Sequence, residues 1–172
     1  MLEELLKAVP LTPGQALDMR PSFIYFDLCN VLVFMGRDRP AWQPTSSTEP
    51  ISLNVGMLPV VAALERVRVP IGILSNLSAA PWQHIVERDW GILPGRFQEI
   101  VLSCEVGISK PEPAFFAEAA ARAGVDPAQI YYCDDTPAHV AAARAVGWDA
   151  EVFTSAVAVA DSLGRRGLNL GL

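Results

Sequence analysis

Short apolar runs recur along the chain, and they lack the alternation of polar and apolar residues that marks a half-exposed strand. Continuous apolar runs of this length are typical of strands that are covered on both faces in a parallel sheet. The pattern therefore predicts five buried strands, at residues 23–28, 69–74, 97–102, 130–133 and 150–153.

Segments with the spacing of amphipathic helices lie between these runs. They cover residues 58–66, 81–89, 111–123, which opens on proline, and 137–146, which closes near Gly147. Strands that alternate with helices form right-handed βαβ units. We therefore expect an α/β, Rossmann-like three-layer sandwich in which ligands gather at the carboxyl ends of the strands.

The chain is long enough for one well-packed domain. We place this domain at residues 23–172 and interpret residues 1–22, broken by Pro10 and Pro13, as a helical appendage. Residues 34–56 contain three prolines and a Ser/Thr cluster, so they are expected to form the one long irregular loop or flap.

Composition excludes several classes of protein. The chain has 13 Lys and Arg against 19 Asp and Glu, a net charge of −6, so a nucleic acid partner is not expected. No apolar run approaches the length that spans a bilayer, and Glu3 and Glu4 do not fit a signal peptide, which predicts a cytoplasmic protein. The three cysteines lack CxxC spacing, so we expect free thiols.

Polar residues follow four of the predicted strands where each strand ends. Asp27 follows the first strand, and Ser75 and Asn76 end the second. Lys110 comes after the third strand, just before a proline, and the fourth ends in Asp134–Asp135. A nucleophile, a hydroxyl group, a cation and paired carboxylates should thus meet at one edge of the sheet.

These four groups, in this order, resemble the motifs of the haloacid dehalogenase superfamily. The stretches "EVGISKPEPAFF" and "DDTPAHVAAARAVGW" are typical of it, and the resemblance runs from about residue 23 to the C-terminus. It implies the sheet order 5-4-1-2-3 and hydrolysis of a phosphorylated substrate with Mg²⁺ as cofactor. Phosphatases of this superfamily pass through an aspartyl phosphate.

The resemblance also implies a role for each motif residue. Asp27 would be the nucleophile, and Mg²⁺ would be held by Asp27, the Cys29 carbonyl and Asp134, with Asp135 orienting Lys110 or a metal-bound water. Ser75, the Asn76 backbone and Lys110 would bind the phosphoryl oxygens and stabilise the charge that develops on them.

Cys29 departs from the family pattern, because phosphatases of the superfamily usually carry a second aspartate two residues after the nucleophile. A thiol with a pKa of about 8.5 is a poor general acid at neutral pH. Loss of general acid–base help costs on the order of 10²–10⁴ in rate. The sequence therefore predicts slow hydrolysis of alkyl phosphates.

Several accounts of Cys29 stay open. The substrate could have a good leaving group, or the acid could come from Asp38 or Glu49 in the loop. The stretch "DLCNVLV" resembles the "DLGNV" variant of a branch that includes sugar-phosphate phosphatases. A dehalogenase needs no proton donor, but this chain lacks the tyrosine and arginine of those relatives. A silent phosphoryl- or metal-binding regulatory protein is the rival, and a redox role of Cys29 with Cys133 is a further option.

A bundle-like helical cap is not expected. After strands and helix, about two dozen proline-rich residues remain between Asp27 and Ser75, too few for such a cap. A nearly capless, open site suits a bulky phosphorylated substrate, or a cap that a second subunit of a homodimer supplies. Arg37, Arg39 and Trp42 in the loop are candidates for substrate contact.

Overall fold

The structure is a computed structural model that describes residues 20–35, 51–79, 82–83 and 96–172. Its centre is a five-stranded parallel sheet in the order β5-β4-β1-β6-β7. The strands are β1 (Phe23–Phe26), β4 (Ile71–Ser75), β5 (Phe97–Leu102), β6 (Ile130–Asp134) and β7 (Asp149–Val152). This confirms the five predicted strands. Numbered one to five along the chain, they also have the predicted order 5-4-1-2-3, with β1 in the middle.

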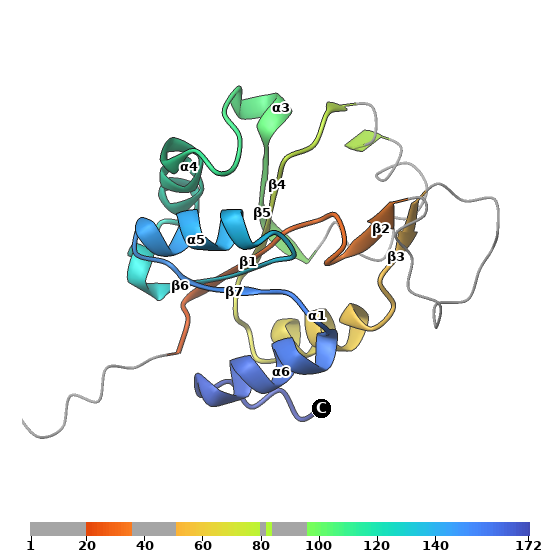
Figure 1. Ribbon diagram of the computed structural model, residues 1–172. Helices are drawn as coiled ribbons and strands as arrows, with labels where there is room; N and C mark the ends of the chain where they lie inside the picture. The colour runs from red at the N-terminus through yellow and green to blue at the C-terminus, as the bar shows by residue number, and fades with distance from the viewer. Residues whose placement is uncertain (1–19, 36–50, 80–81, 84–95) are drawn as a thin grey trace, which may run out of the picture.

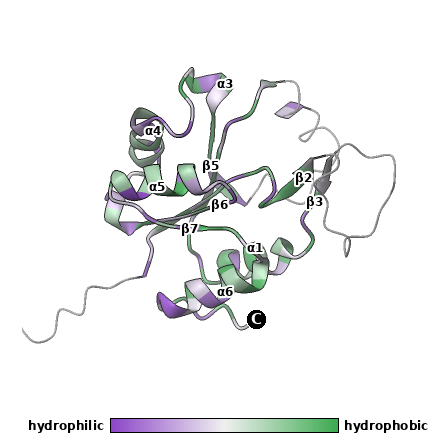
Figure 2. Cartoon of the chain, in the orientation of Figure 1, coloured by the Kyte–Doolittle hydropathy of each residue, from purple (hydrophilic) through white to green (hydrophobic). Residues whose placement is uncertain are grey.

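Helices cover both faces of the sheet and give the predicted three layers (Figure 1). One face packs against α1 (Met57–Arg66) and α6 (Ala156–Arg165), and the other against α4 (Pro113–Ala123) and α5 (Pro137–Ala145). The short α3 (Ser103–Val106) follows β5, and a 3-10 turn, Pro127–Gln129, precedes β6. Hydrophobic residues occupy most of the strands and the inner sides of the helices (Figure 2).

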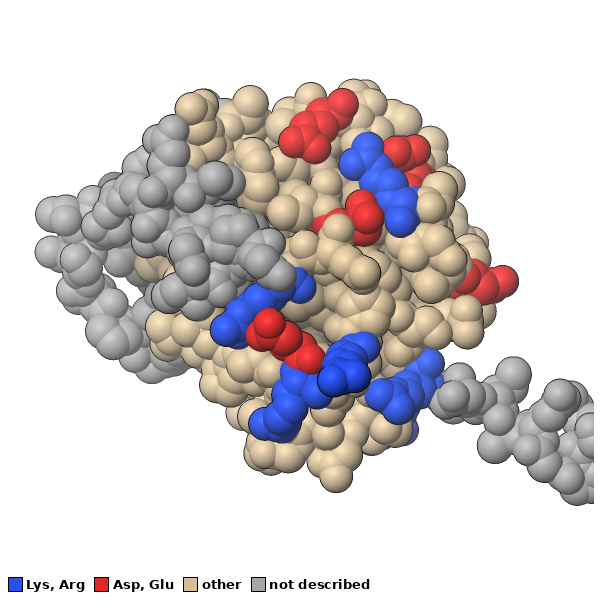
Figure 3. Space-filling model, turned by 180° about the vertical axis from the view of Figure 1, so that it is seen from behind, with Lys and Arg blue, Asp and Glu red and all other residues tan. Residues whose placement is uncertain are grey.

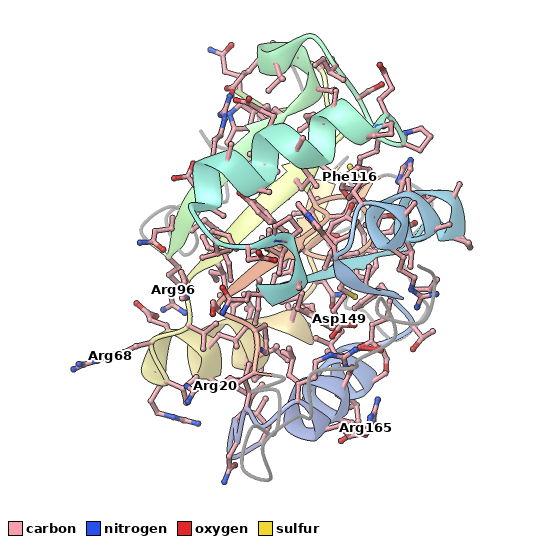
Figure 4. All side chains as sticks on the ribbon, turned by 90° about the vertical axis from the view of Figure 1, so that its left-hand side faces the viewer. Arg20, Arg68, Arg96, Phe116, Asp149 and Arg165 are labelled. Atoms are coloured by element: carbon pink, nitrogen blue, oxygen red, sulfur yellow. The ribbon has the colours of Figure 1, made fainter. Side chains whose placement is uncertain are left out.

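Alternate residues of β1 serve the two halves of the core, as the geometry of a strand requires. Ile24 and Phe26 belong to the cluster under α1 and α6, whereas Tyr25 belongs to the cluster under α4 and α5. Phe116 points from α4 into this second cluster (Figure 4), where its ring meets Trp148 edge-on with 5.4 Å between ring centroids. Because all four residues of β1 are buried, Asp27 leaves the strand inside the protein.

Proline, glycine and serine set the ends of several helices. Pro113 and Pro137 stand in the first turns of α4 and α5, where a missing backbone N–H costs nothing. Gly124 ends α4 in the left-handed conformation at φ 68°. Ser155 caps α6, because its side chain accepts a hydrogen bond from the Ala158 N–H group.

Two features differ from the sequence-based expectations. The two ends of the segment expected to be an irregular loop pair as an antiparallel hairpin of β2 (Val33–Met35) and β3 (Ile51–Leu53). α6 was not predicted at all. The expected helix 81–89 and the appendage 1–22 lie almost entirely outside the described residues.

Charged side chains are spread over the described surface. The face seen from behind shows basic side chains close to acidic ones (Figure 3). Arg96 forms an ion pair with Glu65 at 3.3 Å. Arg68 and Arg96 lie on the same side of the molecule (Figure 4). None of the described helices has both the length and the apolar character needed to cross a bilayer.

Candidate active site

The predicted residues meet at the carboxyl edge of the sheet. Asp27 follows β1, Ser75 ends β4 and Asp134 ends β6. Lys110 reaches the same point from the segment before α4, and its Nζ lies 2.9 Å from Asp27 Oδ1 and 2.7 Å from Asp134 Oδ2. Asp135 completes a group of three carboxylates, with Asp27 and Asp134, whose nearest oxygens all lie within 4.8 Å of one another.

Lys110 is almost completely buried, with 3% of its surface exposed, and its ammonium group is fully engaged. Besides the two carboxylates, its Nζ lies 2.9 Å from the Leu74 carbonyl oxygen and 3.0 Å from the Tyr132 hydroxyl oxygen. An ammonium group has three N–H donors, and four acceptors surround this one. What Lys110 offers a substrate is therefore its positive charge.

Asp134 is surrounded by donors from four residues. Its Oδ1 accepts the Thr136 N–H at 2.7 Å, and its Oδ2 accepts from Lys110 and from the Tyr132 hydroxyl. His139 of α5 places Nδ1 3.1 Å from Oδ2, a hydrogen bond that a neutral ring makes only as the Nδ1–H tautomer. Burial would raise the pKa of Asp134, but Lys110 and these hydrogen bonds outweigh it and hold the pKa below its usual value.

Asp27 has fewer partners. Burial raises its pKa above the usual value, since the nearby positive charge of Lys110 does not fully offset the loss of water and the repulsion from Asp134. Asp27 and Asp134 thus share one lysine. Because Asp27 has fewer hydrogen-bond partners than Asp134, its carboxylate has more room for another ligand.

Two positions in the site hold groups whose role the sequence did not reveal. The Asn76 side chain binds the backbone of Lys110 at both ends, donating to its carbonyl oxygen and accepting from its N–H, each at 2.8 Å. The Asn30 Nδ2 donates to Asp135 Oδ2 at 2.8 Å. Asp135 was expected to orient either Lys110 or a metal-bound water. Lys110 forms its ion pair with Asp134 and not with Asp135, so Asp134 orients the lysine.

Ser75, which the sequence predicted as a donor to a phosphoryl oxygen, ends β4 at the same edge of the sheet. Ser75 is 1% exposed, and its Oγ makes no hydrogen bond of normal geometry among the described residues, although the Cys29 thiol lies beside it. A buried hydroxyl without a partner is costly, so such a group is a natural place for a ligand to bind. Beside Asn76 a shallow depression of about 520 Å³ opens, lined mainly by hydroxyl-bearing and apolar side chains, Ser78, Ser103, Ser109, Leu77 and Ile108.

Cys29 lies half-buried two residues after Asp27. Burial, together with the negative charge of Asp27, raises the pKa of its thiol to about 11. Burial also raises the pKa of the Cys133 thiol. The redox role of Cys29 depended on a lowered pKa of its thiol, and the raised pKa contradicts that premise. The raised pKa supports the expectation that Cys29 is a weak acid.

The donor set fits a divalent cation. Three carboxylates carry three negative charges against the one positive charge of Lys110, which leaves two negative charges in a mostly buried site. Mg²⁺ prefers carboxylate and carbonyl oxygen ligands. The residues present would therefore hold such an ion, and the Cys29 carbonyl stays a predicted ligand beside them.

Comparisons with known proteins indicate a family of hydrolases. A model of the family described as haloacid dehalogenase-like hydrolase matches residues 40–147, a range that includes Ser75, Lys110, Asp134 and Asp135 but begins after Asp27 and Cys29. The chain is 31% identical over 80 residues to glyceraldehyde 3-phosphate phosphatase of Methanopyrus kandleri, covering 46% of this chain and 33% of that protein. It is 31% identical over 91 residues to flavin mononucleotide hydrolase 1 of Arabidopsis thaliana, covering 53% and 37%. The matched part is thus about a third of the length of these relatives.

Solved structures share the fold. An uncharacterized protein from Corynebacterium glutamicum matches with a TM-score of 0.61 and 25% identity, covering 88% of this chain and 97% of that one. A haloacid dehalogenase family enzyme from Bacteroides thetaiotaomicron, solved in complex with magnesium and inorganic phosphate, matches with a TM-score of 0.65 and 16% identity, covering 78% and 95%.

Proposed function

Since the chain belongs to the haloacid dehalogenase-like hydrolase family, we propose that it is a Mg²⁺-dependent phosphatase that forms an aspartyl phosphate on Asp27. The observation that carries this proposal is the group of three carboxylates, two of which form ion pairs with the buried Lys110. The phosphatase and hydrolase names of the two sequence relatives support a phosphorylated substrate, and the Bacteroides complex supports magnesium.

The free oxygens of the site suggest which carboxylates hold the metal. Three of the donors around Asp134 converge on its Oδ2, whereas Oδ1 accepts the Thr136 N–H and keeps a position for a further ligand. Asp27 and Asp135 have fewer protein donors, so we assign all three carboxylates as metal ligands, with Asp134 also holding Lys110. When bound, Mg²⁺ neutralises the phosphate and polarises the phosphorus–oxygen bonds.

The chain's own residues would then carry two displacements at phosphorus. In the first, an Asp27 oxygen forms a bond to phosphorus while the bond to the leaving oxygen breaks. In the second, water attacks the aspartyl phosphate and releases inorganic phosphate, which restores Asp27. Ser75 would donate its unpartnered hydroxyl to a phosphoryl oxygen, and Lys110 would stabilise the developing charge.

Cys29 limits both displacements. A thiol with a pKa of about 11 neither protonates a leaving alcohol effectively nor accepts a proton from the attacking water near neutral pH. Acyl and phenolic phosphates, whose leaving groups need little protonation, are therefore the preferred substrates. The open depression beside Asn76, without charged side chains in its described lining, suits an uncharged leaving group.

The test is hydrolysis of p-nitrophenyl phosphate and acetyl phosphate with and without Mg²⁺. We expect metal-dependent turnover that is lost in Asp27→Asn. Asp126→Asn is a matched control, because Asp126 only caps the 3-10 turn before β6 and lies at the surface. Equal rates in Asp27→Asn and the parent protein would contradict the proposal.

A catalytically silent phosphoryl- or metal-binding regulatory protein is the second candidate. Cys29 favours this candidate, because a thiol with a raised pKa cannot replace the usual acid–base group in an otherwise intact site. Silence on both substrates, with Mg²⁺ still bound, would support this candidate over the phosphatase.

A further inference from the structure

Asn30 combines an unusual backbone conformation with a contact to a candidate metal ligand. Its φ of 62° lies in the left-handed region, where glycine is favoured and asparagine is among the most tolerated other residues. The described helix ends at Gly107 and Gly124 adopt this region with glycine. A glycine would serve the turn at Asn30 equally well, so the backbone alone does not explain the amide side chain.

The side chain of Asn30 reaches across the site to the motif after β6. Its Nδ2 donates to Asp135 Oδ2 at 2.8 Å, a contact between residues 105 positions apart in the chain. This contact fixes the orientation of the amide, because only the NH₂ group can donate to a carboxylate. Oδ1 therefore faces away from Asp135, and it is buried without a hydrogen-bond partner.

We propose that Asn30 is a positioning residue for magnesium: its amide holds the Asp135 carboxylate in the orientation that leaves the remaining lone pairs directed to the metal. The inference rests on the proposed function only in taking Mg²⁺ as the ligand of this site. Asp135 has one further side-chain partner in the described structure, the Thr136 hydroxyl at 3.2 Å. The shorter bond from Asn30 is therefore the main restraint on the orientation of Asp135.

The test measures Mg²⁺ affinity by calorimetry in the absence of any substrate. Asn30→Gly permits the left-handed backbone and removes the side chain with its amide. Residues that orient metal ligands typically contribute 10–100-fold to metal affinity. We expect Mg²⁺ binding to weaken at least 10-fold while the melting temperature of the metal-free protein stays close to that of the parent. Asn30→Ala should weaken binding to a similar extent and also lower the melting temperature, because alanine tolerates positive φ poorly.

Asn54→Ala is the matched control. Asn54 is 2% exposed, and its Nδ2 donates to the Val31 carbonyl oxygen at 2.9 Å, so it supports the same loop without touching Asp135. We expect this variant to lose stability and to keep its Mg²⁺ affinity. A role through Asp135 also requires non-additivity, so Asn30→Gly should change affinity little in an Asp135→Asn background.

The outcomes separate this inference from the proposed function. Mg²⁺ affinity of Asn30→Gly within twofold of the parent, or losses that add fully in the double variant, would overturn the positioning role. A parent protein that binds Mg²⁺ but hydrolyses neither phosphate substrate would overturn the phosphatase and leave the inference standing. Absence of Mg²⁺ binding to the parent would overturn both.

Discussion

Cys29 stands at the position where the acid–base group of this chemistry is expected, and its thiol has a pKa of about 11. Replacing it with aspartate restores a carboxyl group next to the site. We expect Cys29→Asp to raise turnover of alkyl phosphates by about 10²–10⁴-fold, because both displacements gain proton transfer. Turnover of acetyl phosphate should rise as well, because its slow step, hydrolysis of the aspartyl phosphate, gains the same proton transfer.

The measurement is kcat on both substrates for Cys29→Asp and for Ala128→Asp. Ala128 is exposed on the 3-10 turn that precedes β6, at the edge of the sheet opposite the site, so its replacement should leave both rates unchanged. An unchanged alkyl-phosphatase rate in Cys29→Asp would show that the thiol is not what limits the reaction.

The thiols themselves provide a second test at this scale. Only the thiolate reacts with iodoacetamide, so a raised pKa slows alkylation. In the metal-free protein at pH 8 we expect Cys104 to be alkylated first, with Cys29 and the buried Cys133 protected. Peptide mass spectrometry follows each site, and the Cys29 rate should rise as the pH approaches about 11.

In denaturant the three thiols should react at similar rates. Preferential alkylation of Cys29 in the folded protein would contradict the raised pKa.

The site residues differ in how far the sequence predicted them. Asp27, Ser75, Lys110 and Asp134 were found because each follows a recognisable apolar run, and strand ends of a parallel sheet meet at one edge. Tyr132, His139 and Asn30 were missed. Their roles depend on which neighbours they contact across the fold, and a tyrosine inside an apolar strand gives no sign of the hydrogen bond that its hydroxyl makes with Asp134.

At the scale of elements, the strands were predicted well because they are buried on both faces and therefore continuously apolar. α6 was missed because residues 156–160 alternate alanine and valine without the polar spacing of an amphipathic helix, and because the helix contains Gly164. It is held in place by Arg166, which binds Asp149 and Glu151 of β7 and lies over the Tyr131 ring. The hairpin of β2 and β3 was missed because prolines and polar residues between its strands indicate a loop.

The middle of the sheet contains a position where a side chain does not fit. A Cβ added at Gly72 of β4 would lie 2.5 Å from Tyr25 Cε1 and 2.8 Å from the Glu99 carbonyl oxygen. The ring cannot move away freely, because the Tyr25 hydroxyl donates to the Ala119 carbonyl oxygen at 2.9 Å. We expect Gly72→Ala to lower the free energy of unfolding by about 1–3 kcal/mol.

Gly164→Ala is the opposite case. Gly164 lies in α6, and an added Cβ there meets nothing within 4 Å. Alanine is the better helix former, so the free energy of unfolding should rise by about 0.5–1 kcal/mol. Urea denaturation of both variants measures the pair, and a Gly72→Ala variant as stable as the parent would contradict the packing described here.

At the scale of the whole molecule, the sequence predicted one α/β domain with β1 in the centre, and the structure confirms the sheet order and the three layers. The three layers could be predicted because strands and helices alternate along the chain, whereas the sheet order came from the resemblance to the superfamily. The domain boundaries and the absence of a bundle-like cap stay predictions. The physiological substrate depends on what covers the open edge of the sheet, which strand and helix patterns do not specify.

The aspartyl phosphate on Asp27 is tested most directly by the mass of the protein after it is quenched in acid during turnover of acetyl phosphate with Mg²⁺. Because Cys29 gives the attacking water little help, the aspartyl phosphate should form faster than it is hydrolysed and should accumulate. We expect an adduct of one phosphoryl group on the peptide that contains Asp27. The amount of adduct should be smaller in Cys29→Asp, and no adduct should form in Asp27→Asn. Turnover without any adduct, and unchanged in Asp27→Asn, would contradict this prediction.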